Sequence, residues 1–179
     1  MDSQIKKINN LKNHHQKLFI LVGGGSASGK NYFANSLNFP LLDVDQINEK
    51  LNNGKVDCRN TISKALSIVK KKLQENFENG ISFIQVSTAA GYPGTCNKFK
   101  LAKEHRFTTV FVNIDVPIKT ALINNEHRVL NGGHGFTIPK WKIIASNISS
   151  KTVFNQLRKT EWVDYSFKIR NKGVNIGRF

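Results

Sequence analysis

Short continuous apolar runs alternate along this chain with longer segments in which apolar residues recur every three or four positions. Three runs, at 17–23, 81–88 and 108–114, have the length and unbroken hydrophobicity of buried parallel strands. Two weaker runs, at 41–45 and 162–169, are interpreted as strands as well. The pattern therefore predicts about five strands, separated by segments long enough to hold helices.

The segments between the runs have helical periodicity and helix-boundary residues. In the longest, 60–79, the apolar residues fall on one face and Gly80 ends the helix. The predicted helices cover 3–16, 29–38, 46–52, 60–79, 96–105, 117–130 and 139–157. Helices alternating with strands predict an α/β fold, a doubly wound parallel sheet with both faces covered. We expect residues 1–179 to form a single domain that begins with a helical extension at 1–16.

Length and composition restrict the class of protein. A chain of 179 residues with 39% hydrophobic residues can build one folded core. Its longest aliphatic and aromatic run, 18–22, is far shorter than the roughly 20 residues that cross a bilayer, and the polar N-terminus has no signal-peptide pattern. Cys58 and Cys96 lie far apart in sequence and in no C-x-x-C motif. We therefore expect a cytoplasmic protein without a membrane span, a disulfide or a zinc site.

The charge of the chain is strongly positive. Lys and Arg number 27 and Asp and Glu 12, which gives a formal net charge of +15. This balance favours an anionic partner: a nucleotide, a nucleic acid or another phosphate-rich ligand. The alternative is a compositional bias toward Lys and Asn, since the chain also contains 21 Asn. Both explanations stay open, and the sequence predicts no oligomeric state.

Residues 24–30, Gly-Gly-Ser-Ala-Ser-Gly-Lys, match the pattern G-x-x-x-x-G-K between an apolar strand and a helix. Glycines permit a tight loop whose N–H groups surround phosphate oxygens, and Lys30 would reach the β- and γ-phosphates of ATP or GTP. Asn31 stands where such loops carry a Ser or Thr that binds Mg²⁺, and its carbonyl oxygen is also a magnesium ligand by type. The predicted nucleotide-binding residues are Gly24, Gly25, Ser26, Ala27, Ser28, Gly29, Lys30 and Asn31.

Asp43 and Asp45 end the second predicted strand. Residues two apart on a strand point the same way, so we expect both carboxylates to face the crevice that holds the phosphates. One carboxylate can hold Mg²⁺ and the other can accept the proton of an acceptor hydroxyl, as phosphoryl transfer requires. The alternative is that Asp45 caps the helix predicted at 46–52.

Four segments together resemble the zeta-toxin-like branch of the P-loop kinases, over roughly residues 18–170. They are the loop GGGSASGK, the segment LLDVDQIN, the strand ISFIQVST with the AAGYPG that follows, and His127-Arg128 with GGHGFTIP. The resemblance implies that Lys30 binds the nucleotide, that Asp45 is the catalytic base and that Arg128 belongs to a lid. Zeta-type kinases phosphorylate a sugar hydroxyl of UDP-N-acetylglucosamine. The acid with which that family ends its third strand is absent, because this chain has Val-Ser-Thr at 86–88.

The segment LLDVDQINEK is also similar to the D-x-D segment of shikimate kinases, in which the first Asp serves magnesium and the second the substrate hydroxyl. The substrate loop and the arginine-rich lid of that family are replaced here by AAGYPG and NGGHGF. This second resemblance implies that Asp43 binds the metal, and it again gives Asp45 the role of base.

A glycine-rich stretch between two predicted helices indicates a lid at 128–142. Arg128 would there neutralise charge on the transferred phosphoryl group. His134 lies between two glycines and is a candidate contact to phosphate or acceptor, the alternative being a solvated loop histidine. Thr88 and Tyr92 follow the third strand, where a doubly wound sheet offers its acceptor site; the alternative is a plain turn built by glycines and proline.

The sequence thus predicts a kinase that moves the γ-phosphate of ATP or GTP, with Mg²⁺, to a hydroxyl group. The acceptor would be a nucleotide, a nucleotide-sugar or a nucleic acid. The alternative is a catalytically impaired nucleotide-binding module that binds nucleic acid or a partner protein. Asn31 and the missing acid after the third strand favour that alternative.

Overall fold

The computed structural model describes residues 2–52, 59–130 and 138–171. Within these ranges the strands form one sheet in which every pairing is parallel, with the order β2-β3-β1-β4-β5. The strands are β1 Leu18–Gly23, β2 Leu41–Leu42, β3 Phe83–Val86, β4 Thr108–Asp115 and β5 Tyr165–Arg170. The prediction of an α/β fold with a doubly wound parallel sheet of about five strands is confirmed.

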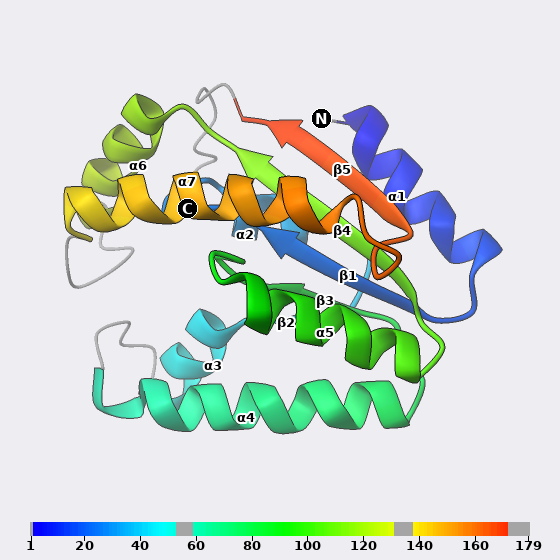
Figure 1. The fold of residues 1–179 in the computed structure, drawn as a ribbon. Coiled ribbons are helices and arrows are strands. Elements are labelled where there is room, and N and C mark those ends of the chain that lie inside the picture. Colours follow the sequence, from blue (N-terminus) through cyan, green and yellow to red (C-terminus); the bar gives the residue numbers. More distant parts are fainter. Residues whose placement is uncertain (1, 53–58, 131–137, 172–179) are drawn as a thin grey trace.

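Helices cover both faces of the sheet (Figure 1). They are α1 Asp2–His14, α2 Lys30–Asn35, α3 Val44–Leu51, α4 Arg59–Glu78, α5 Tyr92–Glu104, α6 Ile118–Leu130 and α7 Lys140–Leu157. One core cluster joins residues of α4, α5 and α7 to the sheet, and a second joins residues of α1 and α2 to it. Because β1 lies at the centre of the sheet, all six of its residues are buried.

The two faces of the sheet are packed with different side chains. The face under α4, α5 and α7 is rich in phenylalanine, and its rings pack edge-on or tilted with centroids 5.0 to 6.5 Å apart. These residues are Phe19, Phe77, Phe83, Phe99, Phe107, Phe111 and Phe154. The opposite face is mainly aliphatic. Alternate residues of each buried strand thus serve separate cores, as the unbroken apolar runs require.

Two element boundaries differ from the sequence prediction in ways that affect the site. The strand expected at 41–45 ends at Leu42, because Asp43 caps α3, which begins at Val44. Helix α5 begins at Tyr92 rather than Cys96, because Pro93 occupies its first turn, where a missing N–H costs nothing. Cys96 is buried in the core, whereas Cys58 lies outside the described residues. No helix in the described ranges is both long and apolar enough to cross a bilayer.

A polar contact holds β5 against β4. Asp164 accepts a hydrogen bond from the backbone N–H of Thr109 at 2.8 Å and pairs with Lys103 of α5. Burial works to raise the pKa of Asp164, but the hydrogen bonds and charge of Lys103 and the hydrogen bonds of Thr109 outweigh it. The pKa therefore lies below its ordinary value.

We predict that Asp164→Asn lowers the free energy of unfolding at pH 7 by about 1 kcal/mol, since the carboxylate is lost but the ion pair is partly screened by solvent. A carboxyl whose folded-state pKa is depressed stabilises the fold above its unfolded pKa of about 3.9. That contribution disappears as the pH falls through the folded-state pKa. Urea unfolding at about pH 7 and pH 2.5 should show that the difference in free energy of unfolding between variant and wild type becomes smaller in acid.

The exposed Glu161, which has no ion-pair partner among the described residues, offers the matched control. Glu161→Gln should leave stability nearly unchanged at both pH values. If Asp164→Asn lowers the free energy of unfolding equally at both pH values, the ionic role of Asp164 is contradicted.

Candidate phosphate-binding site

The glycine-rich loop lies where the central strand leaves the sheet. β1 ends at Gly23, and α2 begins at Lys30, so residues 24–29 form the loop between them. The backbone enters the left-handed region at Ala27 (φ 58°) and at Gly29 (φ 85°). Lys30 turns back over the loop, and its Nζ donates to the carbonyl oxygen of Gly25 at 3.3 Å. The strand–loop–helix arrangement that the sequence predicts is therefore present.

The first turn of α2 contacts the start of α3. Asn31 donates from its amide nitrogen to Oδ2 of Asp43 at 2.7 Å, and the backbone N–H of Asp45 donates to Oδ1 of the same carboxylate at 3.0 Å. Asp43 is buried, with 4% of its surface exposed, whereas Asp45 is exposed. One carboxylate thus connects the helix after the loop to the helix that carries the second aspartate.

Two expectations about these aspartates are wrong. Asp43 and Asp45 do not share a strand face, because β2 ends before them and both belong to the beginning of α3. The helix cap is Asp43 and not Asp45, since it is Asp43 whose side chain accepts the N–H two residues later. Asp45 instead projects from the first turn of the helix, in an exposed position.

The two candidate metal ligands lie in contact with each other. Oxygen ligands from a carboxylate and an amide suit Mg²⁺, which usually takes only one or two protein groups besides phosphates and water. The buried carboxylate of Asp43 beside Asn31 fits that requirement. In the described part of the chain no group of three or more His, Cys, Asp and Glu residues could hold a metal by itself.

The candidates for the acceptor side follow β3. Thr88 is exposed after the end of that strand. Tyr92 is the first residue of α5 with 38% of its surface exposed, so the alternative that it belongs to a plain turn is wrong. Since β3 lies between β1 and β2, both residues lie near the sheet edge at which the loop and α3 begin.

The lid candidates are described only in part. Arg128 belongs to α6, but its side chain lies outside the described residues, as does the whole of His134. The segment 128–142 joins α6 to the first turn of α7. Its role as a lid stays a prediction.

Sequence reasoning missed a set of side chains from the C-terminal half that contact the loop. Four residues of this half donate to the loop or accept from it. They are Asn124 of α6, Ser146 and Asn147 of α7, and Asn171 after β5. No local pattern marks them, because contacts between segments about a hundred residues apart follow from the fold and not from spacing.

Comparison with known proteins gives fold likenesses only. No family model matches this sequence, and a search of curated proteins found no match. The PezAT toxin–antitoxin system of Streptococcus pneumoniae contains a chain of similar structure, with TM-score 0.64, 14% identity, and coverage of 94% of this chain and 78% of that one. A protein of Chloroflexus aurantiacus proposed to be a kinase gives a TM-score of 0.63 at 17% identity, and the match covers 88% of this chain and 89% of that one. This chain shares with both proteins its fold, a parallel sheet with helices on both faces.

Two further neighbours with this fold were solved as complexes. AvrRxo1-ORF1:AvrRxo1-ORF2 with ATP gives a TM-score of 0.65 at 12% identity, with 93% of this chain and 61% of that chain covered. A chain of the Pnkp1/Rnl/Hen1 RNA repair complex gives a TM-score of 0.66 at 16% identity, and the match covers 80% of this chain and 47% of that chain. This chain therefore spans about half of the longer neighbours, and only the fold follows from likenesses of this kind.

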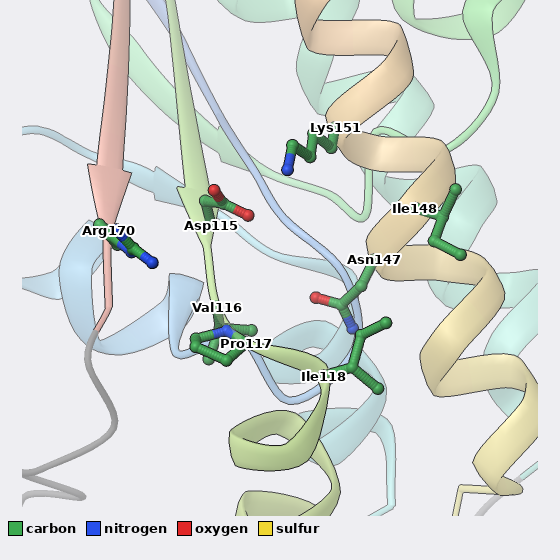
Figure 2. Close-up of a pocket in the computed structure, with 8 residues that line it drawn as sticks. All are labelled: Asp115, Val116, Pro117, Ile118, Asn147, Ile148, Lys151 and Arg170. Atoms are coloured by element: carbon green, nitrogen blue, oxygen red, sulfur yellow. The ribbon is translucent and has the colours of Figure 1, made fainter.

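A pocket of about 270 Å³ lies among the ends of β4 and β5, the start of α6 and helix α7 (Figure 2). Asn147, which contacts the loop, is also one of its lining residues. In Figure 2, Lys151 of α7 and Arg170 of β5 lie on either side of Asp115, whose carboxylate pairs with Lys168 at 3.1 Å. Apolar side chains at the start of α6 complete the wall. Two cationic side chains, one carboxylate and several apolar groups therefore line this pocket, which is connected to the loop through Asn147.

We predict that Asp43→Ala lowers the free energy of unfolding by about 1–2 kcal/mol, because the N–H of Asp45 loses its cap and Asn31 loses its acceptor. Asp43→Asn keeps an oxygen at the cap and should retain most of that stability. Asp45→Ala removes an exposed side chain and should change stability little. Urea unfolding of the three variants checks this, and a loss for Asp45→Ala as large as for Asp43→Ala would contradict the assignment of the cap.

Proposed function

We propose that this protein is a phosphotransferase that moves the γ-phosphate of ATP or GTP to a hydroxyl group of an acceptor. The observation that carries the proposal is the position of the sequence GGGSASGK: it forms the loop between the buried central strand β1 and α2 of a P-loop kinase fold. Loops of this kind bind phosphates through their N–H groups. The neighbour solved with ATP supports the choice of nucleotide.

In this proposal the loop and two cationic side chains bind the transferred phosphates. Lys30, whose Nζ already lies against the loop carbonyl of Gly25, moves to the β- and γ-phosphate oxygens when they occupy the loop. Arg128 of α6 neutralises charge that develops on the phosphoryl group. Both residues act on the triphosphate side of the reaction.

Asp45 is the proposed general base. Its carboxylate is exposed, so an acceptor hydroxyl can reach it, while its backbone N–H is fixed on Asp43. Asp43 in turn contacts Asn31, the residue after Lys30. Two hydrogen bonds therefore connect the peptide of the base to the start of α2, and Asp45 can accept the hydroxyl proton as the oxygen attacks the γ-phosphate.

Magnesium fits the same group of residues. We propose that the Asp43 carboxylate and the side-chain oxygen of Asn31 hold the ion, which neutralises phosphate charge when bound. Asn31 contacts Asp43 through its amide nitrogen. The side-chain oxygen of Asn31 is therefore the atom that would bind the metal ion, directly or through a water molecule. The replacement of the usual Ser or Thr by Asn is then a change of ligand type at an intact site.

The proposed acceptor is an anionic molecule: a nucleotide, a nucleotide-sugar or a nucleic acid. The formal net charge of +15 supports an anionic acceptor in general. The fold neighbour from an RNA repair complex supports including RNA, and the one from a toxin–antitoxin system supports including the nucleotide-sugars of the zeta-type resemblance. Thr88 and Tyr92, exposed after β3, are the proposed contacts to this molecule, together with His134.

We predict that labelled γ-phosphate of ATP or GTP, with Mg²⁺, is transferred to one member of a panel of UDP-sugars, nucleosides, nucleoside monophosphates, shikimate, DNA and RNA. Asp45→Asn should lower kcat by a factor of about 10²–10⁴, because the group that accepts the proton is lost. Glu49→Gln, an exposed acid one turn further along α3, is the matched control and should keep full activity. Transfer rates measured for the three proteins decide the role of the base.

Equal rates for Asp45→Asn and wild type on the true acceptor would contradict the assignment of the base. Nucleotide that binds without transfer to any acceptor would instead favour a nucleotide-binding module that acts through a nucleic acid or a partner protein. Two neighbours with this fold were solved in complexes with other proteins, which is why pull-down with candidate partners belongs to that second outcome.

A further inference from the structure

Three asparagine side chains donate to three successive carbonyl oxygens of the loop. The amide nitrogen of Asn147 donates to the carbonyl oxygen of Ser26 at 3.2 Å. The amide nitrogen of Asn124 donates to the carbonyl oxygen of Ala27, and the amide nitrogen of Asn171 to the carbonyl oxygen of Ser28, each at 3.0 Å. They come from α7, from α6 and from the residue after β5. Three elements of the C-terminal half therefore hold one stretch of loop backbone.

The direction of a carbonyl fixes the direction of the next N–H. In a trans peptide these two groups lie in one plane and point in opposite directions, and no cis peptide occurs in the described chain. A donor outside the loop that holds the carbonyls of 26–28 outward therefore holds the N–H groups of 27–29 on the inner side. Inward N–H groups are what a phosphate-binding loop requires.

Two glycines of the loop leave room for these asparagines. A Cβ placed on Gly25 would lie 2.2 Å from the side-chain carbon of Asn147, and one placed on Gly29 would lie 2.8 Å from the amide nitrogen of Asn171. Neither glycine could be replaced without moving an asparagine. The loop sequence and the asparagine positions are thus fitted to each other, which is an observation independent of the hydrogen bonds.

Helix α7 also holds the peptide group that precedes Ser26. The backbone N–H of Ser26 donates to Oγ of Ser146 at 3.0 Å, while its carbonyl accepts from Asn147. The N–H of Ser26 therefore already donates to a protein side chain, and the N–H of Ser28 donates to the carbonyl oxygen of Gly25 at 3.3 Å. The N–H groups of Ala27 and Gly29 are consequently the ones that this arrangement prepares for an anion.

We infer that Asn124, Asn147 and Asn171 are positioning residues for phosphate binding: their amides hold the carbonyls of Ser26, Ala27 and Ser28 outward and so direct the N–H groups of Ala27 and Gly29 toward the phosphates. The inference rests on the proposed function in that the loop receives phosphates. Asparagine suits the task, because its amide donates a hydrogen bond without placing a competing charge beside the loop.

The test compares Asn124→Ala, Asn147→Ala and Asn171→Ala with Asn155→Ala, which removes an exposed asparagine from α7. Calorimetric titration with inorganic pyrophosphate and with ATP should give dissociation constants about 5–10-fold higher for each of the first three variants. The Asn155→Ala control should bind like wild type. Should an alanine variant fail to fold, Asn→Leu at the same position keeps about the same volume and removes the hydrogen-bonding amide group.

The chemical shifts of the backbone amides in ¹⁵N NMR supply a second readout. A general loss of stability would not change the loop signals selectively. Pyrophosphate should shift the amides of Ala27 and Gly29 in the wild type and leave that of Ser26 in place. In the three variants without ligand, the amides of 27–29 should shift or broaden while signals of the sheet stay unchanged. Unchanged affinity together with unchanged loop signals in folded variants would overturn the inference.

The same data separate this inference from the proposed function. A wild type that binds neither ATP, GTP nor pyrophosphate would refute the proposed function, while the loop signals of the ligand-free variants would still decide whether the asparagines hold the backbone. Phosphate transfer that persists with loop signals unaffected by the substitutions would refute the positioning role alone.

Discussion

A loop that wraps phosphates must turn several N–H groups inward, and the carbonyl oxygens that then face outward need donors from the rest of the protein. In this chain the donors lie 97 to 143 residues further along the sequence. The sheet order makes such contacts geometrically accessible, because β4 pairs directly with β1 and β5 pairs with β4. The loop, the α6–α7 pair and the end of β5 consequently depend on one another for their conformation.

The central strand separates two kinds of group around the loop. Elements on the β4–β5 side supply neutral amides that contact the loop backbone. Elements on the β2–β3 side supply the two aspartates and the exposed residues after β3. A doubly wound sheet offers its binding crevice at the carboxyl ends of such strands. The division places the amides that hold the loop backbone and the two aspartates on opposite sides of β1.

The sequence predicts the fold well because buried strands and amphipathic helices are encoded locally. Unbroken apolar runs gave β1 and β4 nearly residue by residue, and the G-x-x-x-x-G-K pattern located the loop. The aspartates were misplaced because a carboxylate next to a short strand can equally cap the following helix, and only the contact to Asn31 and the N–H of Asp45 shows which it does. Tyr92 was missed as a helix start, since a proline between glycines is compatible with a turn or with a first helical turn.

The asparagines could not have been predicted from sequence. The chain contains 21 of them, and nothing in local spacing distinguishes Asn147, which contacts the loop, from Asn155 two turns later on the same helix. Their significance depends on how α6, α7 and β5 pack around β1, and that is a property of the tertiary structure. Candidate residues that do chemistry are found by motif, whereas residues that hold a backbone in place are found only by contact.

The donors that hold the loop have a consequence for its response to solution conditions. Amide-to-carbonyl hydrogen bonds carry no net charge, so the three asparagine contacts neither titrate nor weaken by ionic screening. The long-range attraction of an anion to a chain of net charge +15 does weaken with added salt. Ionic strength therefore acts on how readily an anion approaches this edge of the sheet, and not on the asparagine contacts that hold the loop backbone there.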